Sequence, residues 1–318
     1  MRWRSADEDG HGDGHENGQV VLFDDVVERH IGRGEFRGME FLHVNARRII
    51  NEVPRSSPVP FRHTINAYRG CSHACTYCFA RPTHEYLDMN SGVDFERRIV
   101  VKVNAVERLR AELADPRWQG ELIAMGTNTD PYQPAEGRYL LTQGLVGELS
   151  AARNPFSILT KSSMILRDLD LLVEAAGRTR VSISLSIGTD DDEIGRLTEP
   201  GAAPPSKRLE AVARLAEAGL RPGVLVAPVL PGISDAEGQL RSVARACAEA
   251  GAVSATPLML HLRPGVREHY LGWLAAERPE LVADHEARYQ RAYLPRAEGE
   301  RVRAIVSEAF RGAARLSA

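Results

Sequence analysis

The chain has 318 residues, of which 43% are hydrophobic and 26% are charged, and its formal net charge is −3. This size allows one sizeable hydrophobic core, and the charge excludes overall electrostatic attraction as the means of binding nucleic acid or a membrane. No apolar run is as long as a membrane-spanning helix, which needs about 18 residues. No apolar signal-peptide segment is found near residue 1, so we expect a cytoplasmic protein with no membrane partner.

The first 60 residues precede any regular alternation of strands and helices. Residues 1–18 are rich in glycine, histidine and acidic residues, and we expect a disordered tail because they offer almost no apolar surface to bury. The histidines of this tail, together with His30, lack a fixed scaffold on which to bind a metal. Residues 19–60 carry short apolar runs and the proline-rich stretch Pro54–Pro60, which predicts a lead-in segment packed on the main domain.

Residues 61–262 form the core of the chain and alternate between strand-like and helix-like patterns. Strand-like runs occupy 64–68, 122–125, 156–160, 181–187, 224–229 and 253–260, and helical runs occupy 103–113, 140–152, 166–176, 209–218 and 236–250. This alternation predicts an α/β fold with parallel strands and right-handed crossovers. Six such units favour a partial (β/α)6 barrel, with a flat doubly wound sheet as the alternative. Either fold brings the polar residues after each strand to one edge of the sheet.

The strand pattern ends before residue 263. Segments 267–293 and 298–314 are rich in Ala, Glu and Arg and predict a helical C-terminal extension over residues 263–318. We expect this extension to cap the barrel.

Three of the four cysteines lie within eight residues, in the spacing C-x3-C-x2-C formed by Cys71, Cys75 and Cys78. This clustering favours a metal or redox site over a disulfide framework. Three thiolates leave one iron of a [4Fe–4S] cluster without a protein ligand, so that iron can bind a small bidentate molecule. A structural zinc site or an electron-transfer cluster usually has four protein ligands. Cys247 lies in a predicted helix among alanines and is interpreted as a core residue.

The cysteine spacing, with Tyr77 before the last cysteine and a series of βα units after it, resembles the radical S-adenosylmethionine (SAM) superfamily over about residues 60–262. The resemblance implies an enzyme that holds a [4Fe–4S] cluster on the three cysteines and binds SAM at the open iron. It also implies that one electron, from a donor such as flavodoxin or ferredoxin, cleaves SAM to a 5′-deoxyadenosyl radical that abstracts hydrogen from a substrate. A non-catalytic iron–sulfur or zinc module is the alternative.

Four further strings resemble the spore photoproduct lyase-like branch of this superfamily. They are Asp130-Pro131-Tyr132-Gln133-Pro134, Thr160-Lys161-Ser162, Glu199-Pro200 and Lys207-Arg208-Leu209-Glu210. In that branch, Glu199 and Arg208 are expected to help hold SAM. Ordinary structural roles remain open for these strings, because an Asp-Pro turn or a solvated arginine at a helix start needs no ligand.

Other SAM-binding roles are assigned by position along the predicted barrel. Tyr77 is expected to shield the cluster, and Lys161, at a strand exit, is expected to meet the SAM carboxylate. The SAM amino group is expected to contact the polar residues Thr127, Asn128 and Asp130. The alternation of the fourth strand turns its serines to the inner face, where Ser184 and Ser186 can hydrogen-bond SAM.

The resemblance leaves the substrate open. One alternative is a nucleic-acid repair or modification lyase, and the other is an enzyme acting on a small molecule, peptide or protein. His261 at the end of the sixth strand is a candidate for proton transfer, although a packed histidine is equally consistent with the sequence. Spore photoproduct lyases return hydrogen through a cysteine and a tyrosine. Here residues 121–130 contain no cysteine and Phe79 replaces the tyrosine, so Tyr132 or solvent is the candidate hydrogen source.

Overall fold

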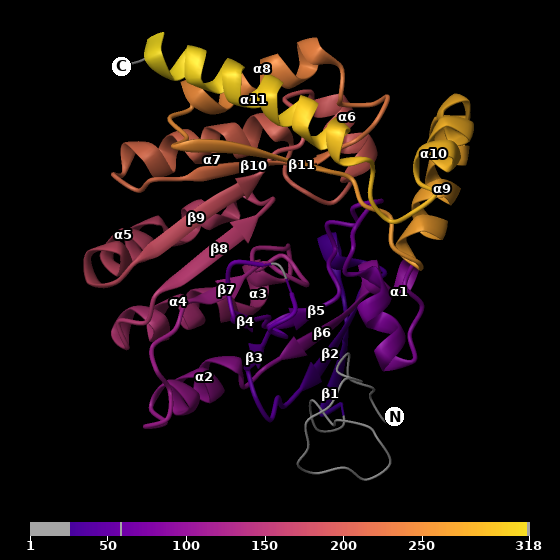
Figure 1. The fold of residues 1–318 in the computed structure, drawn as a ribbon. Helices are drawn as coiled ribbons and strands as arrows, with labels where there is room; N and C mark the ends of the chain where they lie inside the picture. Colours follow the sequence, from indigo (N-terminus) through magenta and orange to yellow (C-terminus); the bar gives the residue numbers. More distant parts are fainter. Residues whose placement is uncertain (1–25, 58, 317–318) are drawn as a thin grey trace.

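A computed structural model describes residues 26–57 and 59–316 of the protein (Figure 1). The tail predicted over residues 1–18 lies outside the described residues, as does the beginning of the predicted lead-in. In the described part of the chain, no helix is long and apolar enough to cross a membrane.

The larger sheet contains the predicted parallel strands. Its order is β11-β10-β9-β8-β7-β4-β3. Six parallel strands follow one another along it: β4 (His63–Ile65), β7 (Ile123–Met125), β8 (Phe156–Thr160), β9 (Val181–Ser186), β10 (Gly223–Val229) and β11 (Ser254–Met259). The strand β3 (Ile50–Glu52) pairs antiparallel with β4 at one edge. A doubly wound sheet would reverse its strand order partway, so the order confirms the partial barrel.

A second, four-stranded sheet has the order β1-β2-β6-β5. It consists of β1 (Glu28–Ile31), β2 (Glu40–Val44), β6 (Arg98–Lys102) and the short β5 (Tyr68–Arg69). The single strand predicted over 64–68 is therefore wrong, because β4 ends at Ile65 and β5 belongs to the other sheet. Between them, the side chain of Asn66 accepts a hydrogen bond from the backbone of Asn128 (3.2 Å). The cysteine loop consequently begins where the two sheets meet.

Helices cover the outer face of the barrel in the order that the sequence predicts (Figure 1). The main ones are α2 (Ala105–Leu113), α4 (Leu141–Ala151), α5 (Leu169–Arg178), α7 (Pro205–Glu217) and α8 (Glu237–Glu249). Their apolar faces and the strands form one buried core that includes Phe156, Leu172 and Cys247. The helix α5 begins later than predicted because Ser163–Asp168 form a 3-10 helix, whose first turn is capped by the hydroxyl of Ser162.

Short elements complete the connections between the sheets and the barrel helices. They are the 3-10 helices Gly34–Phe36 and Arg81–Leu87 and the α-helices α1 (Val93–Arg97), α3 (Glu136–Tyr139) and α6 (Asp192–Thr198).

The C-terminal extension forms two separate layers. The long helix α11 (Arg296–Leu316) packs on α8 and β11 (Figure 1). The helix predicted over 267–293 is instead broken into α9 (Val266–Glu277), a 3-10 turn (Pro279–Leu281) and α10 (Val282–Arg288). Pro279 causes the break because it lacks an N–H and disfavours a helical conformation at the residue before it. Apolar side chains of α9 share a buried cluster with Cys75 and Tyr77, so α9 covers one side of the cysteine loop.

Candidate active site at the cysteine loop

The three clustered cysteines lie on one irregular loop after β5, and all three thiols are free. Cys71 and Cys75 are 7% and 6% exposed, and Cys78 is partly buried. The three thiols do not form a group whose ligand atoms all lie within 4.8 Å of one another, so at least two of them are further apart than that. A cluster in which each thiolate binds a different iron can span such a separation, whereas the ligands of a single zinc lie closer together.

Burial alone disfavours thiolates at this loop. It raises the pKa of Cys78 to about 11, and burial together with the nearby Glu199 raises the pKa of Cys75 well above its ordinary value. Metal binding reverses this preference, because a coordinated thiol is deprotonated by the charge of the ion. The thiol donor set therefore fits iron, and Cys75 and Cys78 need such a partner to ionise at neutral pH.

Arg81 holds the backbone of the cysteine loop, a role that the sequence did not reveal. Its side chain is completely buried and donates to the carbonyl of Cys75 at 2.9 and 3.1 Å and to that of Ala74 at 3.3 Å. Glu96 neutralises it at 2.6 Å. A buried, paired guanidinium that satisfies several carbonyls fixes the loop because each broken bond would leave a buried polar group without a partner.

Gln133 holds the other end of the same loop. Its amide nitrogen donates to the carbonyl of Gly70 at 3.1 Å, and its amide oxygen accepts from the backbone N–H of Ser72 at 3.1 Å. The hydroxyl of Thr129 also donates to Gly70 at 2.7 Å. Gly70 has a φ of 83°, which favours glycine. Gln133 therefore sets the turn from which Cys71 projects.

Replacing Gln133 with leucine is expected to loosen this turn. The change removes the bonds to Gly70 and Ser72 and leaves buried groups unpaired, which costs about 1–3 kcal/mol. We expect a lower thermal transition and faster loss of iron to a chelator from anaerobic protein. Gln119→Leu, at an exposed position, is the matched control and should behave as wild type. Iron loss at the wild-type rate from the Gln133 variant would contradict this role.

A segment after α6 packs tightly against the back of the cysteine loop. The backbone N–H of Thr76 donates to the carbonyl of Thr198, and that of Gly201 donates to the carbonyl of His73, both at 3.0 Å. A Cβ at Gly201 would lie 2.0 Å from the carbonyl oxygen of Ser72, so only glycine allows this approach. The contact brings Glu199, which lies between Thr198 and Gly201, beside the cysteines.

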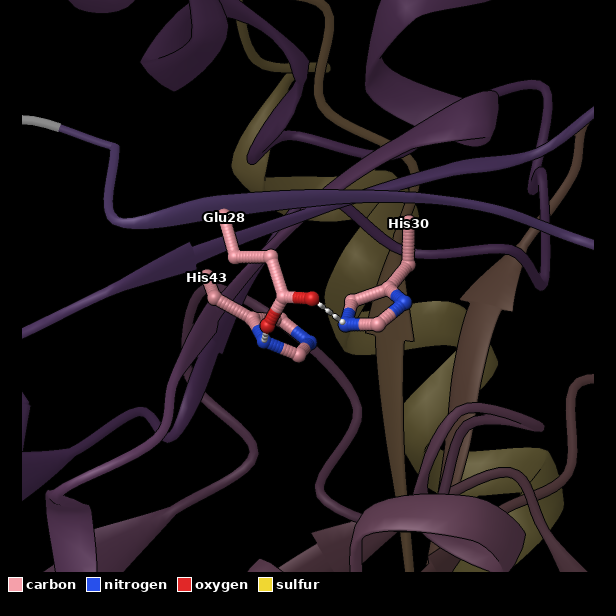
Figure 2. Close-up of side chains that lie close together, drawn as sticks. All are labelled: Glu28, His30 and His43. Carbon is pink, nitrogen blue, oxygen red and sulfur yellow. Dashed lines mark ion pairs between the residues drawn. The ribbon is translucent and has the colours of Figure 1, made fainter.

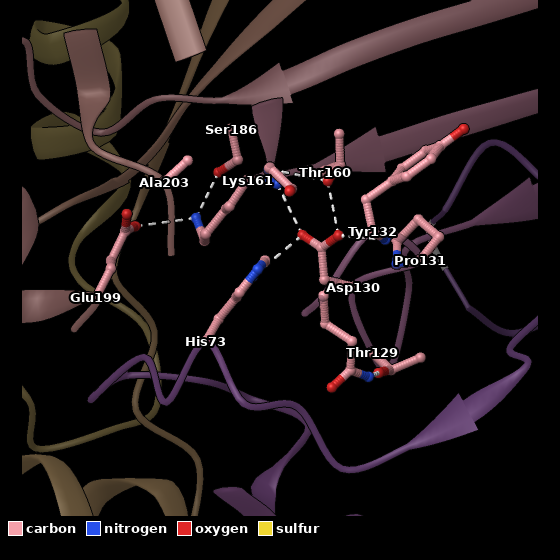
Figure 3. A network of polar contacts seen from close by, with 12 residues as sticks. His73, Thr129, Asp130, Pro131, Tyr132, Thr160, Lys161, Ser186, Glu199 and Ala203 are labelled. Atoms are coloured by element: carbon pink, nitrogen blue, oxygen red, sulfur yellow. Dashed lines mark hydrogen bonds and ion pairs between the residues drawn. The ribbon is translucent and has the colours of Figure 1, made fainter. Parts of the chain in front are cut away.

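Glu199 is the centre of a buried ionic group, defined here as Tyr77, Lys161, Ser186, Glu199 and Arg208 (Figure 3 shows three of its members). Lys161 follows β8, and its ammonium lies 3.1 Å from Glu199 and 2.6 Å from the hydroxyl of Ser186 at the end of β9. Arg208 of α7 pairs with the second oxygen of Glu199, and the hydroxyl of Tyr77 also donates to Glu199. All five residues were predicted site residues, and the structure brings them together.

The ionic group carries one more cation than anion. Burial raises the pKa of Glu199, but Lys161 and Arg208 outweigh it and lower that pKa to about 2, so the carboxylate is ionised at neutral pH. Arg208 is 1% exposed, whereas the side chain of Lys161 is 16% exposed and its ammonium lies 5.5 Å from the centre of the Tyr77 ring. Lys161 is thus the more accessible cation, and it has the charge needed to receive a carboxylate.

Asp130, which is predicted to contact the SAM amino group, lies in a buried network of polar contacts. Its oxygens accept from the hydroxyl of Thr160 at 2.6 Å and the backbone N–H of Lys161 at 2.7 Å, and they lie 3.4 Å from the ring of His73 (Figure 3). Burial lowers the pKa of His73, but Cys71 and Asp130 raise it to about 10. Asp130 therefore links β8 to the cysteine loop, and its oxygens already have partners.

The model of the radical SAM superfamily matches residues 65–242, which contain the cysteine loop and the whole ionic group. The chain belongs to the radical SAM superfamily.

Relatives of this superfamily member cover most of its length. It is 46% identical to an uncharacterized protein of Mycobacterium tuberculosis over 88% of this chain and 82% of that protein. It is 28% identical to an uncharacterized protein of Methanocaldococcus jannaschii over 63% of this chain and 71% of that protein. Two solved mutants of spore photoproduct lyase share its fold. The mutant with bound AdoMet and dinucleoside spore photoproduct has a TM-score of 0.61, and the other mutant has a TM-score of 0.60. Each is 17% identical in sequence, and each match covers 86% of this chain and 79% of the lyase chain.

The remaining predicted residues of the radical SAM core lie outside the ionic group. Thr127 and Asn128 contact the side chain of Asn66, at 3.4 and 3.2 Å. Ser184 lies beside Gly223, the first residue of β10, and two residues before Ser186 along β9.

Neither candidate for hydrogen or proton transfer joins the ionic group. Tyr132 is fully buried, packs near Arg167 and points away from Lys161, so the structure does not bring its hydroxyl to the site (Figure 3). His261 packs between Phe79 and Tyr293, with ring centres 5.8 and 5.5 Å away. Burial, with a contribution from Arg263, lowers the pKa of His261, so its ring is neutral at pH 7.

Proposed function

We propose that this protein binds a [4Fe–4S] cluster on Cys71, Cys75 and Cys78 and binds SAM beside it. The cluster, when bound and reduced, supplies the electron that cleaves a carbon–sulfur bond of SAM and starts radical chemistry on a substrate. The observation that carries this proposal is the ionic group, which places an accessible cation next to a loop of three unpaired thiols. An iron–sulfur or zinc module without catalysis would have no use for that cation.

Lys161 is the residue that we assign to the SAM carboxylate. In the structure its ammonium is held by Glu199 and Ser186, which fixes its direction before a ligand arrives. The cavity lined by Tyr77, Glu199 and Arg208 has a volume of about 10 Å³, enough for about one water molecule and far too small for SAM. This cavity as it stands therefore cannot hold SAM, and the carboxylate of SAM would compete with Glu199 for Lys161.

The surroundings of the loop suit the exclusion of water. The apolar side chains Leu230, Leu260, Tyr270 and Leu274 pack with Cys75 and Tyr77 in one buried cluster. Such a dry environment limits unwanted reactions of radical species.

We place this chemistry in the cytoplasm, with reduced flavodoxin or ferredoxin as the electron donor.

The residues of this chain favour a substrate other than spore photoproduct. Residues 121–130 contain no cysteine, and Phe79, which follows Cys78, has no hydroxyl to donate hydrogen. Tyr132 is buried and points away from Lys161, which leaves solvent as the candidate hydrogen source. A nucleic-acid lyase is therefore the second candidate function, favoured only by the shared fold.

Incubating anaerobic protein with SAM and dithionite is expected to yield 5′-deoxyadenosine, with or without spore-photoproduct dinucleotide. Chromatography should show no thymine repair, because the chain lacks a hydrogen donor at both matched positions. Protein with Cys75→Ala is the control and should yield no 5′-deoxyadenosine. Repair of the dinucleotide over many turnovers without adduct formation would overturn the substrate argument, and absence of 5′-deoxyadenosine from cluster-loaded protein would overturn the proposed function.

A further inference from the structure

The β1–β2 hairpin gathers three metal-binding side chains on one face, away from the chemistry proposed above. In the antiparallel register, Glu28 lies directly opposite His43. His30 is two residues along β1, so it projects on the same side as Glu28. Figure 2 shows the carboxylate of Glu28 between the two imidazole rings. The register of two paired strands thus supplies the scaffold that the sequence alone did not reveal for His30.

The three side chains converge closely enough to share one ion. An oxygen of Glu28 lies 3.0 Å from Nε2 of His30, and the other oxygen lies 3.5 Å from Nδ1 of His43. One ligand atom from each residue lies within 4.8 Å of the other two, which is true of no other such group in residues 26–57 and 59–316. Two imidazoles and one carboxylate are ligands that zinc accepts, and three protein ligands leave a fourth position for water or an anion.

A second observation concerns the far nitrogen of His43. Nε2 lies 2.8 Å from the hydroxyl of Tyr139, whose ring also packs edge-on against the imidazole with centres 5.3 Å apart. When Nε2–H donates to this hydroxyl, Nδ1 keeps its lone pair and faces Glu28. Metal-binding histidines commonly have such a partner on the nitrogen that does not bind, because it fixes the ring and its tautomer. The side chain of His43 is only 13% exposed, so its orientation is set by packing.

We propose that Glu28, His30 and His43 bind a divalent transition-metal ion, with zinc the best match to the ligands. Such an ion links the edge strand β1 to β2, which is itself paired with β6. Three arginines, Arg29, Arg33 and Arg138, line the adjacent hollow together with His30. Their charge opposes a bare cation and favours an anion in the fourth coordination position. This site uses none of the residues of the cysteine loop or the ionic group.

The test is a zinc count on cluster-loaded protein. Anaerobic protein is dialysed against about 1 µM free zinc, and iron and zinc are measured separately by mass spectrometry. We expect one zinc per chain in addition to the iron. His30→Gln and His43→Gln are each expected to remove that zinc, and Tyr139→Phe should weaken binding by about 10- to 100-fold. Because His30 lies on an edge strand, its variant remains informative if the His43 variant fails to fold.

Two controls separate this site from other histidines. His63 lies 3.5 Å from Glu121, a histidine–glutamate pair that is not part of such a three-ligand group, and His63→Gln should keep the zinc. A double variant with His11 and His15 changed to glutamine should keep it as well. Undiminished zinc in both the His30 and His43 variants, or loss of zinc in the double variant, would overturn the proposal. Weak binding that the His30 and His43 substitutions do not change would identify an adventitious ion only.

Discussion

Replacing any one of Cys71, Cys75 and Cys78 with alanine is expected to abolish the iron–sulfur absorbance of anaerobically reconstituted protein, which should otherwise hold about four irons per chain. Each thiolate is expected to bind a different iron of the cluster. One iron already has no protein ligand, so each substitution would leave two irons without one and would open the cluster to solvent. The loop itself should survive, because Arg81 and Gln133 hold its backbone through carbonyl and amide groups and not through the sulfurs.

Cys247→Ala is the matched control and is expected to keep the cluster. Cys247 lies in α8, is completely buried in the barrel core, and has a pKa that burial raises to about 12. It therefore behaves as a small apolar residue, and its replacement should cost on the order of 1 kcal/mol of folding free energy. A cluster that survives in all three loop variants, or that disappears only in the Cys247 variant, would mean that the ligands are assigned wrongly.

Lys161→Ala is expected to leave the cluster intact and to weaken SAM binding by about 1.5–3 kcal/mol, or roughly 10- to 150-fold. The reason is the loss of the accessible cation of the ionic group. Glu199 stays paired with Arg208 in the variant, so no buried carboxylate is left without a partner and the fold should hold. Anaerobic equilibrium dialysis with labelled SAM measures the change.

Lys207→Ala is the control for Lys161. Lys207 pairs with Glu210 at 2.7 Å on the surface of α7, with 62% of its side chain exposed. Such a pair contributes little, so SAM affinity should not change. Equal affinity in the Lys161 variant would reject its role toward the carboxylate. Loss of iron in that variant would instead mean that Lys161 supports the cysteine loop.

The regular part of the fold could be predicted because its signals are local. Apolar periodicity located β8 and β9 to within one residue, and the spacing of the three cysteines marked the loop that carries them. The split between β4 and β5 could not be seen, because residues 64–68 read as one strand-like run and the contact made by Asn66 comes from Asn128, 62 residues further along the chain. The break at Pro279 did have a local signal, and a proline within a helical pattern should have ended the predicted helix.

The site depends on contacts between distant residues. Tyr77 and Glu199 are 122 residues apart, and no spacing rule joins them, so only the family resemblance indicated that Glu199 belongs beside the cysteines. The supporting roles of Gln133 and Arg81 escaped prediction because a buried amide or guanidinium looks, in sequence, like any polar loop residue. The contacts of Asp130 with Thr160 and Lys161 could not be predicted for the same reason, because those residues lie 30 and 31 positions further along the chain.

Electron paramagnetic resonance of dithionite-reduced protein, recorded before and after adding SAM, tests the central claim most directly. A cluster held by three thiolates has an iron whose ligand can be exchanged, so its spectrum must change when SAM binds to that iron. We predict the signal of a reduced [4Fe–4S] cluster and a shift of its g-values with saturating SAM, a shift that Lys161→Ala moves to higher SAM concentration. A cluster signal that excess SAM leaves unaltered would contradict the proposal that Cys71, Cys75 and Cys78 hold a SAM-binding cluster.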